Sequence, residues 1–66
     1  MKDNLKQIQD KLMNLPGDSI FAISVRNGAK ENLDSCLDMI RSQAFDNYNI
    51  VQSIIGNKLL TEILSL

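Results

Sequence analysis

Apolar residues recur at helical spacing near the start of the chain. Four aliphatic residues follow one another at intervals of three, four and three: Leu5, Ile8, Leu12 and Leu15. This spacing places them on one helix face, with polar residues around the rest, and Pro16-Gly17 is a typical helix stop. The apolar stripe is narrow, like the seam of a coiled coil. We therefore predict an amphipathic helix whose apolar face packs on another element.

Residues 19–25, SIFAISV, combine β-branched and aromatic types with little polarity. This composition favours a largely buried strand, with Phe21, Ile23 and Val25 on one side. A lone strand leaves its backbone N–H and C=O groups without partners, and no second segment has equal strand character. The segment is thus either a strand paired with its own copy in a second chain or a short buried helix capped by Asp18 or Ser19. We favour the strand.

Two further helices are predicted in the second half of the chain. Within residues 29–44, one helical face collects the apolar side chains of Leu33, Cys36, Leu37, Ile40 and Ala44. The turn-forming segment FDNYN ends this helix. Residues 50–66 continue with helical spacing and helix-favouring leucines, and we expect a helix there, kinked or split at Gly56. The Gly56-Asn57 pair is also a hairpin signal, which we consider the weaker interpretation.

Together these segments predict a mainly α protein with a single domain spanning residues 1–66. The expected fold is a small three-helix domain, or an α+β variant in which residues 19–25 form one short strand across an oligomer interface. A domain of this size buries about 60% of the surface of its unfolded chain and often needs a disulfide, a metal or a partner chain. Cys36 is the only cysteine and histidine is absent, so neither an internal disulfide nor a zinc site is available.

By elimination, we predict a homo-oligomer, either a dimer or a higher closed assembly. Its interface is assigned to the N-terminal stripe, the predicted strand and the C-terminal helix. The interface residues are Leu5, Ile8, Leu12, Leu15, Phe21, Ile23, Val25, Leu59, Ile63 and Leu66.

The charge balance argues against several classes of partner. Seven basic and eight acidic residues give a net charge of −1, so no basic excess attracts nucleic acid or anionic lipid. A small helix-turn-helix DNA-binding protein is therefore a weak alternative, because no predicted helix has the basic or amide-rich face of a recognition helix. No apolar run approaches the roughly 20 residues needed to span a bilayer. With a free cysteine and no signal-peptide pattern, we expect a cytoplasmic protein.

Side chains suited to catalysis are scarce. Without histidine there is no ordinary general base near neutral pH. Cys36 lies on an apolar helix face, which indicates a core residue rather than a reactive thiol. Asp34 and Asp38 lie one helical turn apart, but solvated charges explain them better than a metal site. We therefore expect no enzymatic activity, no cofactor and no metal.

The best polar cluster is the segment SVRNGAKEN, residues 24–32. If a strand ends here, Asn27-Gly28 forms a tight turn, and the first backbone N–H groups of the next helix attract an anion. Arg26 would add a bidentate phosphate contact and Lys30 a point charge. A plain turn is the stronger interpretation, because phosphate loops contain more glycines and Glu31 has the wrong charge. On the anion hypothesis, Arg26→Ala abolishes ligand binding and leaves the oligomer and its stability intact.

A second weak cluster lies near Tyr48 and includes Asn49, Asn57 and Lys58. The tyrosine ring offers a surface for stacking on a base or a peptide side chain, although a partly buried aromatic at a helix start is the stronger interpretation. The hypothetical ligand-binding residues are Arg26, Asn27, Gly28, Lys30, Tyr48 and Lys58.

These observations predict a small non-enzymatic interaction protein. The favoured function is an oligomeric inhibitor, or an antitoxin-like or anti-repressor-like module, that engages a protein partner through apolar helix faces. The alternative is a phage-type counter-defence sponge that sequesters a small anionic nucleotide signal in a pocket at the oligomer interface. The phage analogy comes from size and composition rather than from particular residues.

Overall fold

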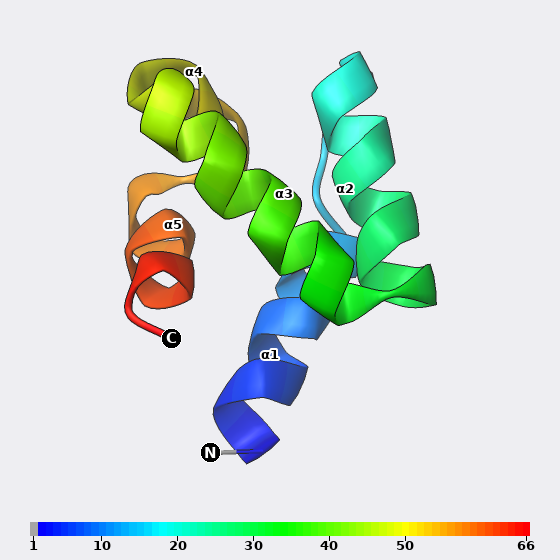
Figure 1. Ribbon diagram of the computed structural model, residues 1–66. Coiled ribbons are helices and arrows are strands. Elements are labelled where there is room, and N and C mark those ends of the chain that lie inside the picture. The colour runs from blue at the N-terminus through cyan, green and yellow to red at the C-terminus, as the bar shows by residue number, and fades with distance from the viewer. Residues whose placement is uncertain (1) are drawn as a thin grey trace.

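Five α-helices follow one another along the chain (Figure 1). The structure is a computed structural model that describes residues 2–66, with side chains from Asn4 onward. Between residues 2 and 66 it has no strand, so the mainly α prediction is confirmed, with five helices in place of three. The helices are α1 Lys2–Met13, α2 Ile20–Glu31, α3 Leu33–Asp46, α4 Tyr48–Ile55 and α5 Asn57–Leu64.

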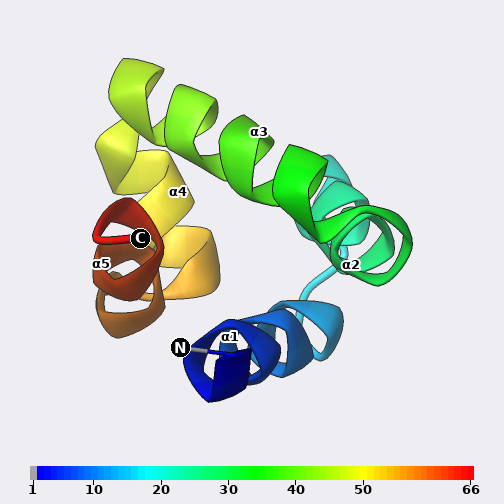
Figure 2. The ribbon, with the colours of Figure 1, turned by 60° about the horizontal axis from the view of Figure 1, so that its bottom comes forward.

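Each helix packs against the next one in the chain, and α5 returns to contact α1 and α3. In Figure 2, α1, α2, α3 and the α4–α5 pair surround a common interior. Side chains from all five helices and the first linker fill this interior. The buried core residues are Ile8, Leu12, Leu15, Ala22, Val25, Ala29, Cys36, Leu37, Ile40, Ala44, Val51, Ile55, Leu59, Leu60 and Ile63.

The segment predicted as a strand, residues 19–25, is helical in this structure, because α2 begins at Ile20 and includes the rest of the segment. Ser19 caps the helix, and its Oγ accepts a hydrogen bond of 3.1 Å from the backbone N–H of Ala22. A helix satisfies its backbone groups internally, whereas a lone strand leaves them unpaired. This difference outweighs the strand preference of the β-branched residues, and the alternative of a helix capped by Ser19 is the one observed.

The tight turn predicted at Asn27-Gly28 is also absent, because α2 continues to Glu31. Gly28 instead permits a close approach to α3: a Cβ atom at this position would lie 3.2 Å from the Cβ of Cys36. The chain breaks at Asn32, whose N–H donates to the carbonyl oxygen of Gly28 at 2.8 Å. The Asn32 side chain accepts a hydrogen bond of 3.2 Å from the N–H of Ser35. This one residue therefore ends α2 and caps α3.

The C-terminal segment is helical and divided at Gly56, as predicted. Gly56 has a φ angle of +92°, a conformation that side-chain-bearing residues rarely adopt. Its N–H donates to the carbonyl oxygen of Gln52 at 2.8 Å and ends α4, while its carbonyl accepts from the N–H of Leu60 at 3.0 Å in α5. Among the helices of residues 2–66, none has the length and apolarity required to cross a membrane.

Candidate interaction surfaces

Residues 24–31, predicted as the corner between a strand and a helix, lie within α2. Arg26 is half-buried, and its Nη1 donates hydrogen bonds of 2.7 Å to the carbonyl oxygens of both Leu15 and Gly17. Arg26 therefore holds the α1–α2 linker against α2, a role that sequence reasoning missed. Asn27 and Lys30 are exposed on α2. Because this segment lies inside a helix, the N–H groups expected to face an anion donate within α2 instead.

The second predicted cluster joins the starts of two helices. The Tyr48 hydroxyl donates a hydrogen bond of 3.2 Å to Oδ1 of Asn57, which connects the first turn of α4 to the first turn of α5. Lys58 follows Asn57 and is exposed. The tyrosine hydroxyl thus has a structural partner within the chain.

Most of the predicted interface residues pack in the core of their own chain. Leu5 and Phe21 are partly buried against the core, while Ile23 and Leu66 are exposed. Side chains that are buried in their own protomer offer almost no surface to a second chain. The buried members of the predicted set are Ile8, Leu12, Leu15, Val25, Leu59 and Ile63.

The groups considered for chemistry make structural contacts. Cys36 is buried, and its Sγ lies 3.5 Å from the carbonyl oxygen of Val25. Burial raises the pKa of the Cys36 thiol, which favours the protonated and less reactive form. Asp38 pairs with Arg41 at 2.8 Å. Among the described residues, no three potential metal ligands of the His, Cys, Asp or Glu types cluster together.

Large apolar side chains that remain exposed are the main feature missed by the sequence analysis. Ile20 is 84% exposed and Phe45 is 91% exposed, so neither side chain packs within the chain. Contiguous exposed apolar surface is typical of interaction sites. The position of each residue around its helix predicts this exposure, because Ile20 and Phe45 both lie off the buried face. That position can be assigned only when the bounds of the helix are known.

The first exposed surface, here called the uncharged face, comprises Ile20 and Ile23 on α2 and Ile50 and Ile54 on α4. A hollow of about 350 Å³ lies between the linker before α2 and the end of α4, because Pro16–Ser19 and the pair Ser53 and Ile54 line it jointly. Ile20 directly follows this linker, and Ile50 precedes Ile54 by one helical turn. Residues 19–25 and 47–57 contain no charged residue. Asp18 lines the hollow, and the guanidinium group of Arg26 contacts the same linker at the carbonyl oxygen of Gly17.

The second exposed surface, here called the Phe45 ridge, runs along the outside of α3. Its members, Asp34, Asp38, Arg41 and Phe45, are spaced by four, three and four residues and are exposed or half-exposed. They lie on one side of α3, away from its buried face of Cys36, Leu37, Ile40 and Ala44. Two aspartates and one arginine give the ridge a net charge of −1, and Asp46 follows directly after Phe45.

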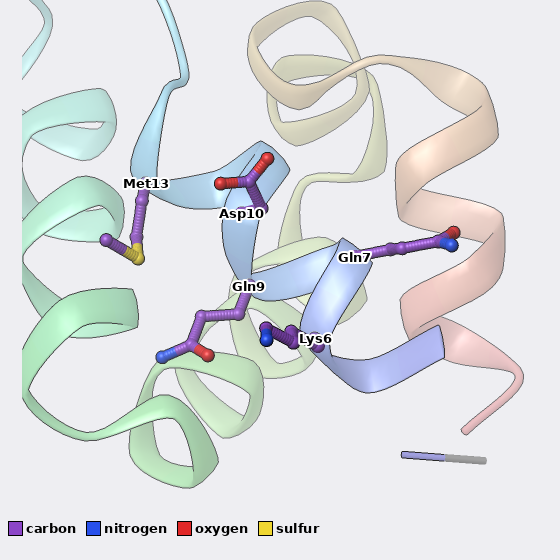
Figure 3. A pocket seen from close by; sticks show the side chains of 5 residues that line it. All are labelled: Lys6, Gln7, Gln9, Asp10 and Met13. Carbon is purple, nitrogen blue, oxygen red and sulfur yellow. The ribbon is translucent and has the colours of Figure 1, made fainter. Parts of the chain in front are cut away.

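A second hollow, of about 460 Å³, lies along the polar residues of α1 (Figure 3). In this view Gln7 and Gln9 extend to opposite sides of the helix. The side-chain nitrogen of Gln9 donates to the carbonyl oxygen of Ala29 at 2.9 Å, so this residue bridges α1 and α2. The polar groups do not converge on one point, unlike the lining of a typical small-molecule site.

Comparisons with known proteins do not add a relative: no protein family model, curated protein or solved structure matches this chain. The two exposed surfaces and their charges are the features of the molecule that bear on function.

Proposed function

We propose that this protein is a small interaction module that binds another protein through the Phe45 ridge and has no catalytic activity of its own. The observation that carries the proposal is the 91% exposure of Phe45 near the end of a well-packed helix. An aromatic ring on a rigid element loses little conformational freedom on binding, and aromatic residues are enriched among the side chains that dominate binding energy.

The rigidity of the ridge follows from the packing of α3. This helix has 14 residues, contacts α2, α4 and α5, and buries four side chains in the core. The ion pair between Asp38 and Arg41 orders the middle of the ridge without covering Phe45. The aromatic ring is thus displayed from a fixed backbone, which supports its assignment as the anchor of a protein contact.

The charges beside Phe45 indicate the chemistry of the partner. Arg41 compensates Asp38 at 2.8 Å, while Asp34 and Asp46 add negative charge on either side along the helix. Complementary charge speeds association and suppresses wrong partners. We therefore expect a partner surface with a pocket for an aromatic ring, bordered by lysine or arginine. The module acts by occupancy: it covers this surface and blocks it, as an inhibitor or an anti-repressor does.

A random peptide display library, selected on the immobilised protein, tests this proposal. We expect the selected peptides to be rich in lysine and arginine, and Phe45→Ala to weaken their binding roughly 30-fold, as for a residue that dominates an interface. Leu64→Ala is the matched control, because Leu64 is an exposed apolar residue on α5. Peptides without a basic excess, or peptides that bind Phe45→Ala as tightly as the parent protein, would contradict the proposal.

A further inference from the structure

We propose that a second copy of this chain covers the uncharged face, so that the protein is a twofold dimer with its two Phe45 ridges outside the interface. Four isoleucines of this face have no complete cover within the chain. Ile20, Ile50 and Ile23 are 84%, 54% and 42% exposed, and Ile54 is partly exposed. Ile54 lines the hollow between the linker and the end of α4, and Ile20 directly follows that linker.

The absence of charge on this face indicates that a second copy of the chain can cover it. A twofold axis places a surface patch against the same patch of the partner copy, so every charge in the patch approaches its own copy. Like charges brought together in a desolvated interface are unfavourable. Residues 19–25 and 47–57 contain no charge at all, and the charges at the border of the face, Asp18 and Arg26, have opposite signs. The uncharged face can therefore meet its own copy with little of this penalty.

The Phe45 ridge provides the contrast. Asp34, Asp38 and Asp46 all lie on or beside it, and Arg41 compensates one of them. Two copies of this negatively charged ridge repel each other, whereas a basic partner is attracted to it. The two surfaces are thus suited to different occupants for the same electrostatic reason.

One property of the whole molecule supports association between copies. The net charge is −1, and a net charge near zero leaves little repulsion between copies. A second copy at the uncharged face also removes the exposed isoleucines Ile20, Ile50 and Ile23 from water, which is favourable.

Sedimentation equilibrium over a range of protein concentrations tests the inference, without any other partner. We expect a dimer for the parent protein, and a roughly tenfold or greater loss of dimer affinity for both Ile20→Asp and Ile50→Asp. These positions lie in the first turns of α2 and α4, where an acidic residue suits the helix dipole. The substitutions should therefore preserve the helices, which circular dichroism checks.

Phe45→Lys is the matched control, because it places a charge of favourable sign in the last turn of α3 and removes a more exposed apolar side chain. We expect this variant to remain a dimer. A parent protein that stays monomeric at the highest concentrations overturns the inference. So does an open series of larger species, or dissociation by Phe45→Lys with no effect of Ile20→Asp. None of these results depends on the peptide selection that tests the Phe45 ridge.

Discussion

The uncharged face and the Phe45 ridge both expose apolar side chains to water, yet their surroundings are opposite. Ile20 and Ile50 belong to segments without a charged residue, whereas Phe45 has aspartates along its helix and directly after it. Apolar exposure alone shows that covering the surface lowers the free energy of the system. The charges around it determine which partner can cover it: a copy of the same chain in one case and a basic surface in the other.

The two surfaces also differ in what supports them. The ridge belongs to one continuous helix, while the uncharged face is assembled from α2, α4 and the linker of residues 14–19. A surface assembled from separate elements depends on the contacts that hold those elements together. We therefore expect mutations in those contacts to affect the uncharged face more strongly than the ridge.

The largest effect is expected from a core substitution that destroys both surfaces together. Leu60 on α5 is fully buried, and Leu60→Ala should lower the free energy of unfolding by about 2–5 kcal/mol. The total stability of a domain of this size is about 3–10 kcal/mol, so the variant should be partly or largely unfolded. Urea unfolding followed by circular dichroism measures the change. A loss below about 1 kcal/mol would show that Leu60 is not a central core residue.

The next effect separates the two surfaces. Arg26→Ala removes the two hydrogen bonds that hold the α1–α2 linker at Leu15 and Gly17, and we expect a loss of about 2 kcal/mol in the free energy of unfolding. Because this linker lines the hollow of the uncharged face, the dimer should also weaken, while peptide binding at Phe45 is kept.

This result would be the reverse of the expectation drawn from the anion hypothesis, in which Arg26→Ala preserves both the oligomer and its stability. Urea unfolding and sedimentation equilibrium on the same variant provide both readouts. A variant that is as stable and as dimeric as the parent protein would show that the linker contacts are dispensable.

A smaller effect distinguishes the surfaces by their response to salt. Raising the ionic strength from about 0.01 M to about 1 M shortens the screening length from about 30 Å to about 3 Å. Binding of basic peptides to the Phe45 ridge should weaken several-fold, because its steering charges are exposed. Dimerisation through the uncharged face should stay constant or strengthen slightly. Titration calorimetry and sedimentation equilibrium at both salt concentrations measure the two responses, and equal salt dependence would remove the electrostatic distinction.

The smallest effect concerns a charge outside both surfaces. Lys11 Nζ on α1 lies 3.7 Å from Glu62 Oε1 on α5, and both side chains are substantially exposed. Exposed ion pairs contribute at most about 1 kcal/mol, so Glu62→Gln should change the free energy of unfolding by less than that. Neither dimerisation nor peptide binding should change. A strong effect on either would mean that contacts between α1 and α5 influence a surface we have treated as independent of them.

The sequence was informative wherever one local property determined the structure. The periodic spacing of apolar residues identified the core face of α1 and the face of α3 that contains Leu37 and Ile40. The division at Gly56 was also predictable, because glycine readily adopts positive φ. Residues 19–25 were misinterpreted since their strand preference is local, whereas the backbone hydrogen bonds that favour a helix depend on the whole segment.

The candidate surfaces were harder to predict for a different reason. The bond from Arg26 to Leu15 spans 11 residues and depends on how α1 and α2 pack, so no short motif encodes it. Ile20 and Phe45 resemble core residues by type, and their exposure follows from the phase of helices whose bounds were uncertain. A pattern of residue types therefore located the core well and the uncovered surface poorly.

The packing of each helix on its neighbour in sequence has a consequence for folding kinetics. Contacts between consecutive helices close short loops, and proteins dominated by such contacts fold in microseconds to milliseconds. The contact between α1 and α5 joins elements far apart in the chain, and we expect it to form late and to open first. Hydrogen exchange should then show the contact between α1 and α5 opening first, while α1, α2 and α3 stay packed against one another.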